Sequence, residues 1–219
     1  CVDQINRIFC NAGDAVHALP PTVGMYKVGA GIAGAEFRAI SLAPDFTIPV
    51  DALKASWDDK SIILWLCSPN NPSGNAMDGA VLEDLIRTFP GIVVLDEAYI
   101  DFVPELSFLS RLEEFPNLII TQTLSKGWGM AGIRLGAAFS SPFIIRMLNT
   151  IKMPYNINVL TTGVALEALS KPEEMQAKVN TLIGERKRLE VELPKLDCVD
   201  YIFPSVTNFL LIRFKDSDK

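Results

Sequence analysis

Histidine and cysteine are scarce in this chain of 219 residues, and their scarcity argues against one class of site. The only histidine is His17, and the four cysteines, at positions 1, 10, 67 and 198, form no CxxC pair. Because cysteine/histidine metal sites need several such ligands at close spacing, we expect no metal site of that kind. His17 is expected to be a surface or turn residue. Scattered thiols suit a reducing compartment, so a cytoplasmic location is expected.

Long apolar runs and clusters of positive charge are also missing. No apolar run reaches the length of about 20 residues that a membrane-spanning helix needs. The net charge is −6 and the basic residues are spread along the chain, so no footprint for a nucleic acid appears. A nicotinamide-binding domain is also disfavoured, because the glycines at 29–34 have GxGxxG spacing but lie in a helix-like stretch and lack the acidic partner of that fingerprint. We therefore expect neither a membrane nor a nucleic acid as a partner.

Short apolar runs alternate with helical patterns along the chain. Strands are predicted at 61–67, 92–96, 118–123 and 134–140. Helices are predicted at 81–87, 142–153, 159–169 and 172–193. Runs that are apolar on both faces and separated by helices are typical of an α/β domain with a mainly parallel sheet flanked by helices.

The long charged helix that begins near residue 172 divides this domain from the remainder of the chain. We expect one large domain over residues 1–170, then a linking helix and the start of a smaller α+β domain over residues 171–219. Within the second part, 197–214 would supply a first pair of strands. Residues 1–10 resemble the later part of an amphipathic helix, and the chain stops soon after a predicted strand. Both ends are therefore expected to be cut through a fold.

Polar motifs follow three of the predicted strands, at the edge where parallel sheets bind ligands. The side chains concerned are Asn71 after the first strand, Asp96 and Tyr99 at the end of the second, and Thr123, Ser125 and Lys126 after the third. Singly, each has an ordinary interpretation as a turn residue, a helix cap or a surface charge. A lysine between hydroxyls and glycines is poorly explained in that way, and the convergence of three motifs predicts a site. Such an amine suits a protein that carries a phosphorylated aldehyde as a Schiff base.

These motifs resemble those of the fold-type I pyridoxal-phosphate aminotransferases of class I/II, in residues, order and spacing. The segments that carry the resemblance are 68–74 (Ser-Pro-Asn-Asn-Pro-Ser-Gly), 96–99 (Asp-Glu-Ala-Tyr), 123–126 (Thr-Leu-Ser-Lys) and 134–136 (Arg-Leu-Gly). Within that superfamily, 20–26 and 96–102 look most like the histidinol-phosphate aminotransferases. The resemblance covers nearly the whole chain and implies pyridoxal 5′-phosphate as the cofactor.

The resemblance also implies a role for each residue. Lys126 would hold the cofactor as a Schiff base and, once freed, move the proton of the substrate. Asp96 would pair with the pyridine nitrogen and keep it protonated, so that the ring accepts the carbanion's electrons. The other implied contacts are to the ring's phenolic oxygen, from Asn71 and Tyr99, and to the phosphate, from Thr123, Ser125 and Arg134.

The implied activity is a ping-pong transfer of an amino group between L-histidinol phosphate and 2-oxoglutarate in histidine biosynthesis, by a homodimer. The alternatives are an aromatic aminotransferase or a threonine-phosphate decarboxylase of the same fold, or a non-catalytic truncated domain. Val23 favours the last, because it stands where the family usually has an aromatic residue that stacks on the cofactor ring. A smaller apolar contact there would weaken cofactor binding by about 1 kcal/mol.

Overall fold

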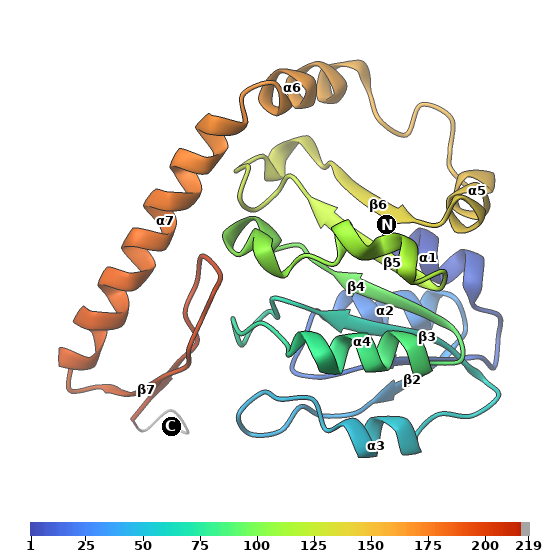
Figure 1. The fold of residues 1–219 in the computed structure, drawn as a ribbon, viewed down its shortest axis with the longest axis horizontal. Helices are drawn as coiled ribbons and strands as arrows, with labels where there is room; N and C mark the ends of the chain where they lie inside the picture. The colour runs from blue at the N-terminus through green and yellow to red at the C-terminus, as the bar shows by residue number, and fades with distance from the viewer. Residues whose placement is uncertain (216–219) are drawn as a thin grey trace.

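A six-stranded sheet organises most of the chain, of which the computed structural model describes residues 1–215. The strands in chain order are β1 (Ala15–Ala18), β2 (Glu36–Ala39), β3 (Ser61–Cys67), β4 (Ile92–Asp96), β5 (Leu118–Thr123) and β6 (Gly136–Ser140). Across the sheet they run β2-β1-β3-β4-β5-β6, so that β2 and β6 form the edges (Figure 1). Every neighbouring pair is parallel except β5 and β6, which are antiparallel. The mainly parallel sheet expected from the sequence is confirmed.

Helices cover both faces of the sheet (Figure 1). The helices on one face are α1 (Val2–Phe9), α2 (Met25–Ile32) and α5 (Pro142–Thr150), and those on the other are α3 (Val50–Ala55) and α4 (Gly79–Thr88). Side chains alternate along a strand, so β3 gives Ile63 and Trp65 to the first face and Leu64 and Leu66 to the second. Each face therefore has its own apolar core, which explains why β3 is apolar from Ile62 to Cys67.

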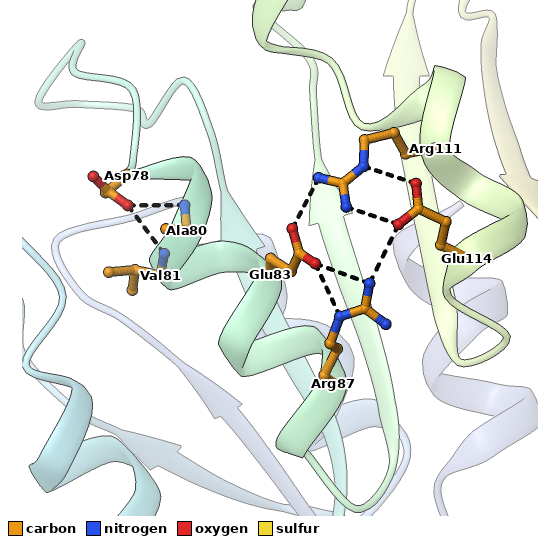
Figure 2. A network of polar contacts seen from close by, with 7 residues as sticks. All are labelled: Asp78, Ala80, Val81, Glu83, Arg87, Arg111 and Glu114. Atoms are coloured by element: carbon orange, nitrogen blue, oxygen red, sulfur yellow. Dashed lines mark hydrogen bonds and ion pairs between the residues drawn. The ribbon is translucent and has the colours of Figure 1, made fainter.

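Capping and a charged network fix α4 (Figure 2). The Asp78 carboxylate accepts hydrogen bonds from the first backbone N–H groups of the helix, at 2.8 and 3.0 Å. Further along, Arg87 of α4 reaches Glu83 at 2.8 Å and Glu114 at 3.2 Å. Arg111 likewise reaches Glu83 at 2.8 Å and Glu114 at 2.7 Å. The network ties α4 to the 3₁₀ turn η3 (Leu109–Glu114), which leads into β5.

The last part of the chain runs along one side of the large sheet (Figure 1). Its elements are α6 (Val159–Leu169), α7 (Pro172–Glu192) and the antiparallel pair β7 (Val199–Ile202) and β8 (Ile212–Phe214). The remaining 3₁₀ turns are η1 (Ile100–Phe102), η2 (Pro104–Leu106), η4 (Ala131–Ile133) and η5 (Leu193–Lys195). Val179 of α7 is fully buried and packs in a cluster with Tyr99 and Phe102 of the large sheet's loops. The strand pair expected within 197–214 is confirmed.

Several expectations need correction. His17 is not a surface or turn residue: it lies in β1, fully buried, with its ring nitrogens 3.2 and 3.0 Å from the Ser56 and Ser61 hydroxyl oxygens.

The bounds of three expected elements also differ. The strand expected from Arg134 begins at Gly136, because Arg134 has a left-handed backbone with φ 55°. The helices expected to reach 153 and 193 end at Thr150 and Glu192. Within residues 1–215, no helix combines the length and apolarity that crossing a bilayer requires.

Candidate active site

The expected site residues gather at the carboxyl edge of the parallel strands. β3, β4 and β5 end side by side, since Cys67 lies opposite Asp96 and Asp96 lies opposite Thr121 in the strand register. Asp96 and Thr123 are the last residues of β4 and β5, and the turn with Asn71 follows the end of β3. The parallel topology thus brings together side chains from three distant segments, as the sequence pattern predicts.

Asp96 ends β4 as a partly buried carboxylate with three hydrogen-bond donors around it. The Tyr26 hydroxyl donates to one oxygen at 2.7 Å, while the Thr121 hydroxyl and the Ala98 backbone N–H donate to the other, each at 3.2 Å. Burial raises the pKa of Asp96 above its ordinary value, and these hydrogen bonds together with the charge of Lys126 act in the opposite direction. Because burial penalises the charged form of Asp96, a positively charged group that binds beside this carboxylate would stabilise it.

Lys126, Tyr99 and Asn71 lie next to one another. The Lys126 ammonium is 4.9 Å from the centroid of the Tyr99 ring, within the range of a cation–π contact. Asn71 Nδ2 is 3.5 Å from the Tyr99 hydroxyl oxygen, at the long limit of a hydrogen bond. The structure thus places an amine, a phenol and an amide at one point of the sheet edge.

Thr123 and Ser125 form a hydroxyl pair beside the Lys126 turn. The Thr123 hydroxyl donates to Ser125 Oγ at 2.9 Å, and the Ser125 backbone N–H donates to Thr123 Oγ1 at 3.1 Å. Arg134 is exposed, and its guanidinium donates to the Ala131 carbonyl oxygen at 2.9 Å. The backbone bond from Leu124 N–H to the Leu135 carbonyl, 3.1 Å long, holds the segments of the hydroxyl pair and Arg134 together.

Val23 precedes α2 and is half-buried. Its side chain packs against the apolar core on the α1 and α2 face, which includes Tyr26 and Cys67. Val23 therefore packs on the same core as Cys67, the last residue of β3, which precedes the turn with Asn71.

Three buried polar residues at this edge have no role in the sequence analysis. Tyr26 is fully buried and bonds Asp96. Asn70 donates to the Pro21 carbonyl at 3.0 Å and to Ser73 Oγ at 2.7 Å. Glu97 accepts bonds of 2.7, 2.8 and 2.9 Å from the Ser107 hydroxyl, the Phe108 N–H and the Gln122 amide.

A sequence signal exists for two of these residues. Asn70 and Glu97 each stand beside an expected site residue, and neighbouring side chains near a strand end point to opposite sides. One of each pair can face a ligand while the other anchors the turn from within. Tyr26 has only its place in the motif at 20–26 as a signal, because its contact with Asp96 joins positions 70 residues apart.

The donor set fits pyridoxal phosphate, the cofactor that the sequence resemblance implies. The amine of Lys126 suits its aldehyde, and the partly buried carboxylate of Asp96 suits a protonated ring nitrogen. The amide and phenol of Asn71 and Tyr99 can donate to its ring oxygen. Hydroxyl, backbone N–H and guanidinium groups are donors that bind phosphate well. Among residues 1–215, no three histidine, cysteine or acidic side chains are grouped so as to hold a metal ion.

Curated relatives match the chain from end to end. It is 46% identical over 218 residues to the histidinol-phosphate aminotransferase of Parabacteroides distasonis, covering 99% of this chain and 63% of that protein. It is 47% identical over 219 residues to the histidinol-phosphate aminotransferase of Bacteroides fragilis strain YCH46, covering 100% and 64%. The chain therefore spans less than two thirds of the length of these relatives.

A solved structure shows the same fold. The histidinol-phosphate aminotransferase of Sinorhizobium meliloti, in complex with pyridoxal-5′-phosphate, superimposes with a TM-score of 0.87 at 23% identity. The match covers 96% of this chain and 58% of that one. The mainly parallel sheet and the helices on its faces are thus those of a pyridoxal-phosphate-dependent aminotransferase fold.

A family model described as aminotransferase class I and II matches residues 1–219, the whole chain. The cofactor that this match indicates is pyridoxal 5′-phosphate, in agreement with the donor set at the sheet edge. The chain belongs to the class I and II aminotransferase family.

Proposed function

We propose that the protein moves an amino group between L-histidinol phosphate and 2-oxoglutarate, using pyridoxal 5′-phosphate, in histidine biosynthesis. The observation that carries the proposal is the meeting of Lys126, Tyr99 and Asn71 beside the Asp96 carboxylate at one sheet edge. The names of the two relatives at 46% and 47% identity support the substrate. The acceptor is inferred from the family resemblance.

The cofactor, when bound, supplies a ring that accepts the electrons of a carbanion formed on the substrate. Lys126 would hold the cofactor's aldehyde through Nζ and, as a free amine, would move the proton of the substrate's Cα to C4′ of the cofactor. Asp96 would pair with the ring nitrogen and keep it protonated. Asn71 and Tyr99 would donate hydrogen bonds to the ring oxygen.

Phosphate binding falls to the segment around the Lys126 turn. Thr123 and Ser125 already form a hydroxyl pair there, and Ser125 contributes a backbone N–H to it. Arg134 can offer two parallel N–H groups to phosphate oxygens, which suits its exposed guanidinium. Val23 would give the cofactor ring a smaller apolar contact than an aromatic side chain gives.

The wider assembly forms part of the same proposal. Residues 1–170 form the large cofactor-binding domain, and residues 171–219 form the linking helix and the start of a smaller domain. The protein acts in the cytoplasm as a homodimer, an arrangement supported by the strongly exposed apolar side chains Val159 and Leu160 of α6.

The test of the proposed function is the yellow colour that pyridoxal phosphate acquires when a lysine holds it. The purified protein should become yellow when the cofactor is added, and borohydride should remove the colour. Lys126→Ala should abolish the colour and lower turnover by about 10²–10⁴-fold, the range of a lost general acid–base group. Lys27→Ala, which changes an exposed lysine of α2, is the matched control and should leave both unchanged.

Substrate choice is tested with the same protein. L-histidinol phosphate with 2-oxoglutarate should turn over faster than aromatic amino acids, and threonine phosphate should release no carbon dioxide. If the protein stays colourless with added cofactor, the enzymatic proposal is refuted and a non-catalytic domain is favoured. Faster turnover of an aromatic amino acid refutes the substrate alone.

A further inference from the structure

Tyr26 makes the shortest side-chain contact to the Asp96 carboxylate. Its hydroxyl donates to Asp96 Oδ2 at 2.7 Å, whereas the two bonds to Oδ1 are each 3.2 Å long. No other hydrogen bond to Oδ2 occurs within residues 1–215. The orientation of this oxygen therefore depends on a single phenol.

That phenol is held rigidly. The Tyr26 side chain is fully buried, and its ring stacks on the ring of Trp65 with centroids 4.5 Å apart and planes 11° apart. Close by, the Thr22 hydroxyl donates to Asn70 Oδ1 at 2.9 Å, which anchors the start of this segment to the turn after β3. The Tyr26 hydroxyl thus has a fixed direction before any ligand arrives.

The charges around Asp96 give this bond an electrostatic consequence. Burial raises the pKa of Asp96, and the Tyr26 hydrogen bond is the foremost influence against that rise, ahead of Thr121, the Ala98 N–H and Lys126. Burial also raises the pKa of Tyr26 well above its ordinary value, so the phenol keeps its proton and remains a donor. Other titratable neighbours include Cys67, whose pKa burial raises to about 12, and Glu97, whose pKa burial also raises.

We propose that Tyr26 is a positioning residue for Asp96: its hydroxyl holds the carboxylate in one orientation and in the ionised form that the cofactor's ring nitrogen requires. The inference rests on the proposed function, because Asp96 has this task only in a protein that binds the cofactor. Tyr26 itself acts through Asp96, from within the core.

Tyr26→Phe is the direct test, because it keeps the ring and its stack on Trp65 and removes only the hydroxyl. In the cofactor-free protein, infrared or ¹³C NMR titration should show a higher pKa for Asp96 in Tyr26→Phe than in the unsubstituted protein. In the loaded protein, cofactor labelled with ¹⁵N should lose its ring proton at lower pH than before. Cofactor affinity should fall about tenfold, the size of a lost hydrogen bond to a charged group.

Two controls separate positioning from a general loss of structure. Thr121→Val removes the longer bond to the other carboxylate oxygen and should shift the pKa of Asp96 less than Tyr26→Phe does. Tyr201→Phe alters a half-exposed tyrosine of β7 and should shift neither the carboxylate nor the ring nitrogen.

The outcomes are distinct. If the protein binds no cofactor, both the proposed function and this inference are refuted. If the protein binds the cofactor, but Tyr26→Phe leaves both the pKa of Asp96 and the protonation of the ring nitrogen unchanged, only the inference is refuted. A raised pKa of Asp96 with earlier loss of the ring proton supports it.

Discussion

Gly74 is the position at which one added methyl group should report how the last part of the chain packs on the turn after β3. Gly74 closes the turn that contains Asn71, and its carbonyl accepts a 2.8 Å bond from the Val206 N–H. Its φ of +79° favours glycine. A Cβ atom built there would lie 2.5 Å from Ser205 Oγ and 2.8 Å from Ser205 Cβ. Gly74→Ala therefore combines backbone strain with a collision.

The two costs can be estimated separately. A left-handed conformation costs an L-residue about 1–2 kcal/mol. Overpacking in a well-packed contact typically adds about 1–3 kcal/mol. The free energy of unfolding should thus fall by about 2–5 kcal/mol in Gly74→Ala. Gly13→Ala is the matched control, because Gly13 also has a positive φ, +93°, but a Cβ there meets nothing within 4 Å, so only the strain remains.

Urea unfolding of the protein and its variants measures these differences in the free energy of unfolding. Ser205→Gly should restore part of the loss when combined with Gly74→Ala, because it removes both colliding atoms. By itself it should destabilise, since Ser205 Oγ accepts a 3.1 Å bond from the Thr207 N–H. The two substitutions should therefore be coupled by about 0.5–3 kcal/mol, the range for residues in contact. Equal losses in Gly74→Ala and Gly13→Ala, or strictly additive effects with Ser205→Gly, would refute the reasoning.

Two further predictions concern the partly buried ring of Phe209 and the buried ring of His17. The Phe209 ring lies edge-on to Tyr99 with centroids 5.1 Å apart, so Phe209→Leu should loosen the Tyr99 ring beside Lys126 and weaken cofactor affinity by about two- to tenfold. Phe203→Leu is its control, and equal affinities in a cofactor titration would contradict the prediction. Burial lowers the pKa of His17 from 6.5 to about 4, so the unfolded chain binds the proton first as pH falls. Stability should therefore decline by about 3 kcal/mol between pH 6.5 and 4, and urea unfolding of His17→Gln should lack this slope.

The sequence identifies the central strands better than the outer ones. The middles of β3, β4 and β5 are buried on both faces, so a mainly apolar run predicts each of them with its observed bounds. β1 and β2 have only four residues each, and His17, Glu36 and Arg38 break their apolar character. Such short strands form because the neighbouring strands supply the pairing, which no local pattern reveals.

The site likewise has contacts that the sequence predicts and contacts that only the structure reveals. Polar motifs at successive strand ends predict that Asn71, Asp96, Tyr99 and Lys126 converge, and the structure brings them together. The contact between Tyr26 and Asp96 depends on the packing of α2 against the sheet, so it appears only in three dimensions. The buried position of His17 likewise depends on the hydroxyls of Ser56 and Ser61, which satisfy both ring nitrogens.

The two edges of the sheet differ in how readily another strand can join them. β2 carries Glu36 and Arg38, and the Arg38 guanidinium bonds Glu36 at 3.1 Å and Asp58 at 2.9 Å. Charges on an edge strand discourage the approach of a further backbone. β6 has no charged side chain over Gly136–Ser140, and its first two residues are exposed. A strand that extends this sheet, from the same polypeptide or from another molecule, would therefore join at β6, and misassembly at high concentration would begin there.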